Sequence, residues 1–411
     1  MKRVVITSTG VISPVGLNTE AFWDSLKAGR HGFSPITSFD PARIPVKCAA
    51  EIKDWDPVAM GLNKKDARRM DRYTQFAMAA AEELMSKAGS LEGVDPYRVG
   101  ILVSSGIGGL MTTLAEHEKY IEKGPERLSV FTIPMMISNM AAGQLAIKYG
   151  FKGDNFAVVS ACATGAHSVG EGFRKIKDGY LDLCIVGGSE ASICEFALGG
   201  FANMGALTFS TDCDRLSIPF DKERSGFVMG EGAGLLLLEE YEHAKARGAS
   251  ILAEVVGYGA TDDAYHITGP DPEGAGAAAA MAAAIREAGI APEQVGYVNA
   301  HGTSTPLNEK CETAAIKRVF GDYAYKLPVS STKSMTGHML GAAGGVEAIA
   351  CALALQEGVL PPTLGYKVPD EECDLDYITE GARRVQVEYA LSNALGFGGH
   401  NACLLLKRYE G

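Results

Sequence analysis

The chain lacks the cysteine spacing of a disulfide framework or a structural zinc site. Its 411 residues include nine cysteines, an odd number, and none of them forms a CxxC pair. Scattered cysteines of this kind favour free thiols over disulfides or metal ligands. Free thiols are typical of a reducing compartment, so we expect a cytoplasmic protein without bound metal.

Signatures of nucleotide, nucleic-acid and membrane binding are also missing. There is no GxxxxGK[ST] phosphate loop, and the glycines of 105–109 have the wrong spacing for a dinucleotide site. The formal net charge of −12 disfavours nucleic acid as a partner. The most apolar helical pattern, 337–355, contains His338 and Glu347 and falls short of the roughly 18–20 uncharged residues of a membrane span. Residues 1–16 are interrupted by Ser, Thr and Gly, and predict a β-strand rather than a signal peptide.

Short apolar runs alternate with Ala- and Gly-rich helical patterns, which indicates α/β layering. The pattern occurs twice, so we expect two similar halves, residues 1–250 and 251–411. The apolar runs are continuous, as in sheets covered by helices on both faces. The predicted strands are 3–12, 98–105, 155–160, 181–188, 250–260, 295–302, 327–333 and the pair within 390–408, and the main predicted helices are 70–88, 274–288 and one from about 338.

Cys162 stands where the strand-like run 155–160 gives way to small residues and a helical pattern. This context places the thiol at a helix N-terminus, where N–H groups and the helix dipole favour an anion. The pattern predicts a nucleophile whose pKa is lowered from the usual value of about 8.5. A buried structural cysteine is the alternative, and it is our interpretation of the other eight cysteines.

Two distant histidines are the best candidates to assist this thiol. His167 is nearer in sequence, but five residues along a helix turn its side chain away from Cys162, so we interpret it as structural. His301 and His338 stand at transitions between loops and regular elements, where catalytic groups concentrate. Two imidazoles donating to one thioester oxygen would stabilise the enolate formed when a malonyl thioester loses carbon dioxide. This chemistry requires neither a metal nor pyridoxal, and we expect no cofactor.

Further groups are expected to support this chemistry. Backbone N–H groups of Cys162 and of the loop 396–399 are expected to bind the tetrahedral oxyanion. Lys333 precedes His338 by five residues, and Glu347 follows it by nine. The two charges predict either a buried ion pair that orients the loop of His338 or a surface salt bridge, and the sequence leaves both open.

A basic run at 63–72 has helical spacing. Its cationic residues are Lys64, Lys65, Arg68, Arg69 and Arg72. On one continuous helix they would share a face, which would either dock an acidic partner or be an ordinary solvated surface.

Five ordered motifs resemble those of the β-ketoacyl-acyl-carrier-protein synthases, condensing enzymes of the thiolase-like superfamily. They are ACATG at 161–165, PFDKERSGFVMGEGAG at 219–234, NAHGTSTPLNE at 299–309, SSTKSMTGHMLGAAGG at 330–345 and SNALGFGGHN at 392–401. The resemblance implies the thiolase-like fold, with two similar α/β halves in five αβαβα layers, usually as a homodimer. It also implies that acyl and malonyl carrier proteins are the partners, and that condensation elongates a fatty acyl chain by two carbons.

The resemblance also implies roles for catalytic residues. Cys162 would be the acyl-accepting nucleophile, His301 and His338 the decarboxylation pair, and Lys333 the supporting lysine.

Other roles implied by the resemblance concern substrate binding. Thr303 and Thr305 would bind the phosphopantetheine arm, which the carrier protein supplies. Phe397 would gate an acyl pocket lined by Ile107 and Phe201. An isoleucine at this position is similar to the synthase II branch of the family.

Some positions depart from the family pattern. Ile218 and Ser225 replace an arginine and an aspartate that are common there, so a structural ion pair is expected to be missing. Glu309 stands where an aspartate is common, and its extra methylene is expected to shift a contact with Lys333. Gly205 occupies a position where a basic residue often meets the carrier protein. The residues then expected to dock the carrier are Lys65, Arg68, Arg69 and Arg127.

Other interpretations explain fewer of these features. A non-catalytic chain-length partner normally lacks the cysteine, and a thiolase has a second cysteine where Phe397 stands. Chalcone-type and initiating synthases have asparagine in place of His338. A cysteine hydrolase has no use for a second histidine, and a pure scaffold explains none of the motifs. We therefore expect a condensing enzyme.

Overall fold

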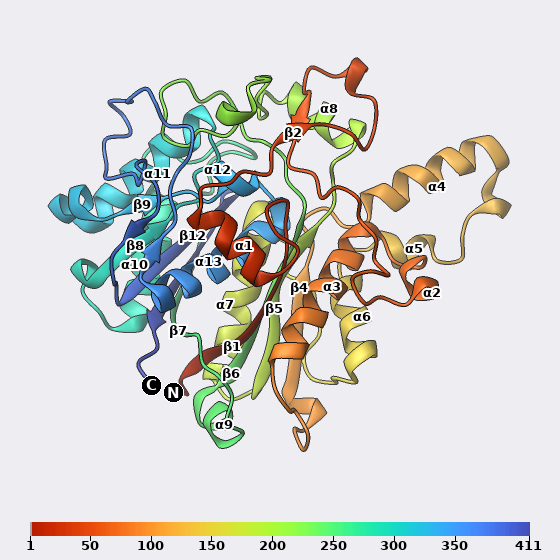
Figure 1. Cartoon of the computed structure of the whole chain (residues 1–411), viewed down its shortest axis with the longest axis horizontal. Coiled ribbons are helices and arrows are strands. Elements are labelled where there is room, and N and C mark those ends of the chain that lie inside the picture. The colour runs from red at the N-terminus through yellow and green to blue at the C-terminus, as the bar shows by residue number, and fades with distance from the viewer. Residues whose placement is uncertain (1) are drawn as a thin grey trace.

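The computed structural model describes residues 2–411 and is built on one mixed sheet of nine strands (Figure 1). Their order is β4-β5-β6-β1-β7-β13-β12-β8-β9. The strands are β1 (Val4–Ile12), β4 (Val99–Ser104), β5 (Leu183–Glu190), β6 (Gly232–Glu240), β7 (Ala253–Asp262), β8 (Val295–Asn299), β9 (Val329–Ser330), β12 (Tyr389–Gly396) and β13 (His400–Arg408). Two short pairs are separate, β2 (Ser34–Pro35) with β3 (Cys48–Ala49), and β10 (Val359–Leu360) with β11 (Arg383–Arg384).

Helices surround and divide this sheet. They are α1 (Thr19–Lys27), α2 (Lys64–Ala67), α3 (Arg72–Lys87), α4 (Leu110–Lys123), α5 (Thr132–Met136), α6 (Met140–Tyr149), α7 (Thr164–Lys177), α8 (Glu195–Asn203), α9 (Tyr241–Ala246), α10 (Ala275–Ala288), α11 (Pro306–Phe320), α12 (Lys333–Thr336) and α13 (Ala343–Glu357).

The two parts of the sheet repeat one topology. In the first, β4 pairs parallel with β5, β5 antiparallel with β6, and β6 antiparallel with β1. In the second, β8 pairs parallel with β12, β12 antiparallel with β13, and β13 antiparallel with β7. A short antiparallel contact between β1 and β7, centred on Val5 and Glu254, joins them. The prediction of two echoing α/β halves is confirmed.

Helices α7 and α13 form the central layer between the halves. They contact each other, and each contacts strands of both halves. Helix α3 covers the outer face of the first half, and α10 covers the outer face of the second. This is the expected αβαβα arrangement. Because the strands have helices on both sides, their side chains are almost entirely buried, which explains the continuous apolar runs.

Two predicted strands differ from the structure, and one strand of the structure was not predicted. The predicted strand 155–160 is wrong, since only Asn155 forms a bridge, with Ile101 of β4, and Phe156 and Val159 are exposed. Residues 327–333 form a strand only at β9. Strand β6 was not predicted because its first residues belong to a glycine-rich run, yet Gly234 is buried, and a Cβ there would lie 2.4 Å from the Val346 backbone nitrogen.

The continuous basic helix over 63–72 is also wrong. Helix α2 ends at Ala67, and Asp71 caps a new helix that begins at Arg72. The Arg72 guanidinium turns inward and pairs with buried Glu231 at 2.7 Å. The other four cations of the run stay exposed.

One helical stretch of the described residues, 340–357, is long and apolar enough to cross a membrane. Of that stretch, 83% is buried inside the protein, as expected of a core helix.

Candidate active site

Cys162 lies in a tight turn, Ala161–Ala163, directly before α7. Ala161 in this turn has the uncommon positive φ of 50°. The turn packs against the end of β12, where a Cβ on Gly396 would lie only 2.6 Å from the Ser160 carbonyl oxygen, so glycine is required there. The predicted position of the thiol at a helix N-terminus is confirmed.

His301 and His338 come from the second half of the chain and meet beside this turn. His301 follows β8, whereas His338 lies between α12 and α13 rather than at the start of a helix. Their ring centroids are 5.2 Å apart, and the ring planes are nearly perpendicular at 87°. The backbone of His338 is held on both sides, donating to the Val228 carbonyl at 2.7 Å and accepting from the Gly230 N–H at 2.9 Å. Both rings and Cys162 line one pocket of about 730 Å³.

Lys333 forms a buried ion pair rather than a surface salt bridge, the two alternatives that the sequence left open. Its side chain is 1% exposed and pairs with Glu347, which is 2% exposed. The two residues come from different helices, α12 and α13, rather than from one. The Lys333 Nζ also lies 3.3 Å from Nδ1 of His301.

This contact determines the tautomer of His301. An ammonium group only donates hydrogen bonds, so Nδ1 is the acceptor and Nε2 carries the proton. Burial, the Lys333 charge and the neighbouring His338 lower the pKa of His301 well below its ordinary value. Burial and Lys333 likewise lower the pKa of His338. Both imidazoles are therefore neutral near pH 7.

His338 is the ring left free for a substrate. Neither of its nitrogens has a hydrogen-bond partner within residues 2–411, although both are buried. A buried polar atom without a partner is costly, and it is a frequent property of functional groups that await a ligand.

The predicted lowering of the Cys162 pKa is wrong for the free protein. The residue is 8% exposed. Burial raises the pKa of its thiol to about 12, and the Lys333 charge and the backbone N–H groups of Phe397 and Cys162 act in the opposite direction. Loss of water outweighs these stabilising groups because a thiolate is poorly solvated inside the protein. The same two N–H groups face the sulfur, as expected for an oxyanion site.

A chain of aromatic contacts leads from Phe397 to His338. Phe397 lies 6.3 Å from Phe201, Phe201 lies 5.5 Å from Phe227, and Phe227 lies 5.2 Å from His338, all between ring centroids. Phe227 lies in the GFVMG run of the motif at 219–234, but no feature of that run indicated a role for its ring. Its two contacts make it the link between the acyl-pocket aromatics and His338.

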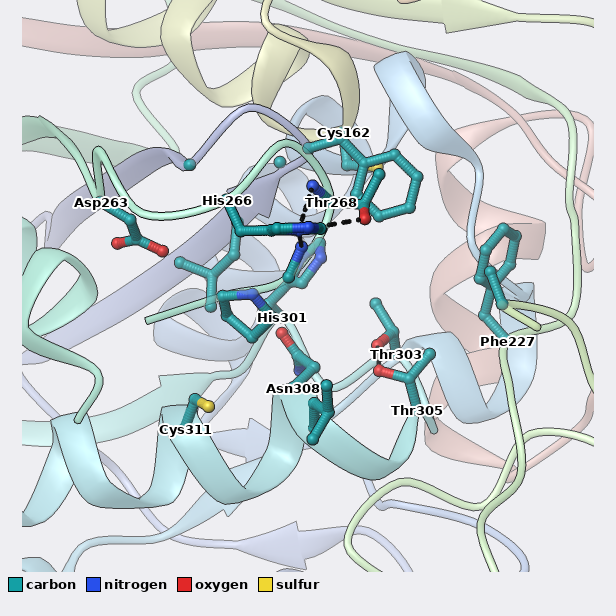
Figure 2. Close-up of a pocket in the computed structure, with 18 of the residues that line it drawn as sticks. Cys162, Phe227, Asp263, His266, Thr268, His301, Thr303, Thr305, Asn308 and Cys311 are labelled. Atoms are coloured by element: carbon teal, nitrogen blue, oxygen red, sulfur yellow. Dashed lines mark hydrogen bonds between the residues drawn. The ribbon is translucent and has the colours of Figure 1, made fainter. Parts of the chain in front are cut away.

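Two threonine hydroxyls also line the pocket. Figure 2 shows Thr303 and Thr305 facing each other, with their Oγ1 atoms 2.9 Å apart. Both line the pocket, and so does Gly205. Ile107 does not line this pocket and is 41% exposed.

Glu309 has a different partner from the one expected. It lies 3.2 Å from the Arg224 guanidinium and accepts from the Ser304 N–H at 2.7 Å, so the predicted contact with Lys333 is wrong. One helical turn later on α11, Glu312 accepts from the N–H groups of His301 and Gly302. Sequence reasoning missed both Arg224 and Glu312, although Glu309 and Glu312 have the i, i+3 spacing of one helix face.

Three other residues have structural contacts. His167 lies 2.6 Å from the Tyr258 hydroxyl and is held away from the other two histidines. The Ile218 N–H donates to Ser304, and the Ser225 hydroxyl lies 3.0 Å from that of Thr208. Ile218 and Ser225, which replace an arginine and an aspartate common in the family, thus form neutral hydrogen bonds instead of an ion pair.

Comparison with known proteins gives the same family along the whole chain. The family model Beta-ketoacyl synthase, N-terminal domain, matches residues 1–244, and Beta-ketoacyl synthase, C-terminal domain, matches 252–367. A 3-oxoacyl-[acyl-carrier-protein] synthase 2 of Synechocystis sp. is 48% identical over 412 residues, covering 100% of this chain and 99% of the relative. A protein of the same name from Staphylococcus aureus is 48% identical over 410 residues with the same coverage.

A solved structure extends the comparison to an assembly. It is described as a type II PKS acyl-carrier protein in complex with its ketosynthase bound to the hexaketide. The matched chain has a TM-score of 0.91 and 32% identity, and the match covers 100% of both chains.

The raised pKa of Cys162 predicts how its reactivity depends on pH. We expect its alkylation by iodoacetamide to rise about tenfold per pH unit to beyond about pH 9, because the thiolate fraction does so below the pKa. Mass spectrometry of the peptide that contains Cys162 measures this rate. The same thiol in the denatured chain is the control and should level off near its usual pKa of about 8.5. A plateau below pH 7 in the native protein would contradict the prediction.

Proposed function

The chain belongs to the β-ketoacyl synthase family, and we propose that it condenses malonyl and acyl groups by a ping-pong mechanism on Cys162, His301 and His338. It is a 3-oxoacyl-[acyl-carrier-protein] synthase of fatty acid elongation. The observation that carries the residue assignment is the convergence of one buried thiol, two neutral imidazoles and two backbone N–H groups on a single pocket.

In the first half-reaction the acyl group moves to Cys162. Its sulfur attacks the carbonyl carbon of an acyl thioester on the carrier protein, and the N–H groups of Cys162 and Phe397 hold the oxyanion. Collapse breaks the bond to the phosphopantetheine sulfur. The thiol proton of Cys162 ends on that leaving sulfur, so the net exchange consumes no external base.

In the second half-reaction a malonyl thioester enters the same pocket. Nε2–H of His301 and an N–H of His338 donate to its thioester oxygen, and carbon dioxide leaves as negative charge develops there. The resulting enolate carbon attacks the acyl-Cys162 carbonyl. The carbon–sulfur bond to Cys162 then breaks, and the thiolate takes up a proton. The released chain is longer by two carbons.

The hydroxyls of Thr303 and Thr305 are placed to bind the phosphopantetheine arm. They line the same pocket as Cys162. Phe397 is proposed to gate entry to an acyl pocket that extends toward Ile107 when its ring moves away from Phe201. Because the carrier brings its own prosthetic group, we propose that the enzyme needs no resident cofactor.

We propose that an exposed basic patch docks the carrier protein. The basic patch consists of Lys64, Lys65, Arg68, Arg69 and Arg127. None of the five lies within 4 Å of a carboxylate in residues 2–411. Arg69 stacks on Phe131, the residue before α5, at 4.7 Å. The five cations of the basic patch would attract an acidic carrier.

We propose that two copies of the chain form a homodimer. Figure 1 shows α4 and the segment after it projecting from the body. Val130 and Ile133 in this projection are 85% and 60% exposed. The irregular segment 156–160, which follows the bridge of Asn155 to β4, leaves Phe156 and Val159 exposed. Both features are unfavourable in water and favour burial against a second copy.

The cytoplasm is the proposed compartment. All nine cysteines are free thiols, and burial raises the pKa of eight of them, including Cys184 and Cys351, which limits their oxidation.

Two substitutions separate the half-reactions. Cys162→Ala should abolish the acyl adduct seen by intact-protein mass spectrometry after mixing with acyl carrier protein. His338→Ala should keep that adduct but slow malonyl decarboxylation about 100-fold or more, because it removes an N–H donor to the enolate. Wild-type decarboxylation rates in His338→Ala would disprove its role. A persistent adduct in Cys162→Ala would disprove the nucleophile.

Charge reversal in the basic patch tests carrier docking. Arg68→Glu should raise KM for acyl carrier protein about tenfold with little change in kcat, and salt should reduce the difference. A short acyl-phosphopantetheine without its protein should react equally with both enzymes. Lys326→Glu, an equal charge change at an exposed site on the second half, is the matched control. Equal KM increases in the two variants would contradict the docking site.

Aspartate substitutions in the projecting segment after α4 test the proposed dimer. Val130→Asp combined with Ile133→Asp should convert the protein to monomers at micromolar concentration, because the interface would have to bury two carboxylates. Sedimentation velocity measures this. Tyr325 lies on the second half and is 52% exposed in the wild type. As the control, Tyr325→Asp should leave the dimer intact. A wild-type protein that sediments as a monomer would refute the proposal.

A further inference from the structure

Glu190 is a buried carboxylate that the mechanism above does not use. It is the last residue of β5 and is 0% exposed. No Lys or Arg among residues 2–411 lies within 4 Å of it. Burial raises the pKa of Glu190 to about 7, while the groups that donate to it act in the opposite direction. A carboxyl group without a cation is expensive to bury, so its hydrogen bonds must hold something in place.

Four donors converge on this carboxyl group. Oε1 accepts from the hydroxyls of Ser105 at 2.6 Å and Ser192 at 3.3 Å. Oε2 accepts from the N–H groups of Gly106 at 2.9 Å and Gly341 at 3.1 Å. One residue therefore ties together the segments that follow β4, β5 and His338.

Two of these segments are packed directly over the turn of Cys162. A Cβ on Gly106 would lie 3.1 Å from the Ala161 carbonyl oxygen, and a Cβ on Gly341 would lie 2.4 Å from the Gly106 nitrogen. Leu340 and Ala161, the neighbours of these contacts, have positive φ angles of 46° and 50°. Such conformations persist only where the surroundings hold them.

Ser105 links Glu190 to the backbone of Ile107 and Gly108. Its Oγ accepts from the Ile107 N–H at 3.3 Å and from the Gly108 N–H at 2.7 Å. A hydroxyl has two lone pairs and one proton. Because both lone pairs are occupied, the proton of Ser105 is directed to Glu190. We call residues 105–108 the acyl loop.

We propose that Glu190 is a positioning residue that clamps the acyl loop against the turn of Cys162 and thereby sets the rate and chain-length range of acyl transfer. The inference rests on the proposed function, because it uses acyl transfer to Cys162. Glu190 acts through Ser105 and the backbone, and touches no substrate.

Glu190→Gln should release the acyl loop selectively. If the amide oxygen takes the place of Oε2, the N–H groups of Gly106 and Gly341 keep their acceptor. The amide NH₂ then faces Ser105, which has no free lone pair to accept it and loses the acceptor for its own proton. The segment after His338 is held as before, and the link to Ile107 is lost.

The experiment measures both half-reactions in Glu190→Gln and Ser105→Ala. Acylation of Cys162 is followed by intact-protein mass with short, medium and long acyl carrier proteins, and decarboxylation by acetyl carrier protein formation from malonyl carrier protein. We expect acylation to fall about 10- to 100-fold, most strongly for one end of the chain-length series, and decarboxylation to change less than about twofold. Ser192→Ala is the matched control. It removes the longest of the four contacts, whose donor lies outside the acyl loop, and should leave both rates unchanged.

Several outcomes would overturn the proposal. These are equal losses of acylation and decarboxylation, a loss that is uniform across chain lengths, or an effect of Ser192→Ala equal to that of Ser105→Ala. If circular dichroism shows that Glu190→Gln does not fold, the two rates of Ser105→Ala test the proposal. Failure of the proposed function gives a different result, because the wild-type enzyme would then form no acyl adduct with any carrier.

Discussion

The buried charge of Lys333 is the interaction on which the rest of the active site depends. Its pairing with Glu347 joins α12 to α13 in the core, where loss of one partner of such a pair costs about 3–5 kcal/mol. Neither side chain can turn away at that cost. The ammonium therefore holds a fixed position beside His301 and gives that ring its Nε2–H tautomer. Burial lowers the pKa of His301 and His338, and the Lys333 charge lowers it further.

Apart from the ion pair of Lys333 and Glu347, burial keeps the reactive groups of the substrate-free site uncharged. The two imidazoles are neutral, and the thiol of Cys162 keeps its proton. Anionic sulfur and enolate oxygen then arise only when a substrate is present, next to N–H donors already in place. Such donors are effective because they need no reorganisation in a site that water does not screen. A premature thiolate would instead be exposed to oxidation and to unselective acyl acceptors.

The halves of the fold bring these groups together through close backbone contacts. A Cβ on Gly345 of α13 would lie 2.2 Å from the Gly234 carbonyl of β6, and one on Gly165 of α7 would lie 2.8 Å from the Gly345 nitrogen. Glycine at these positions lets the central helices approach each other and the sheet. As a result the turn of Cys162 from the first half meets His301 and His338 from the second.

The sequence alone determined the α/β class, the repeat of two halves and the residues with reactive side chains, because apolar periodicity and residue type are local properties. Cys162, His301 and His338 were identifiable because each stands beside the end of a regular element in a distinctive run. Only the tertiary structure decided that burial raises the pKa of Cys162, that Glu309 pairs with Arg224, and that Glu190 gathers donors from three distant segments. Solvation and long-range hydrogen bonds depend on which segments are packed around a group, and that neighbourhood exists only in the folded chain.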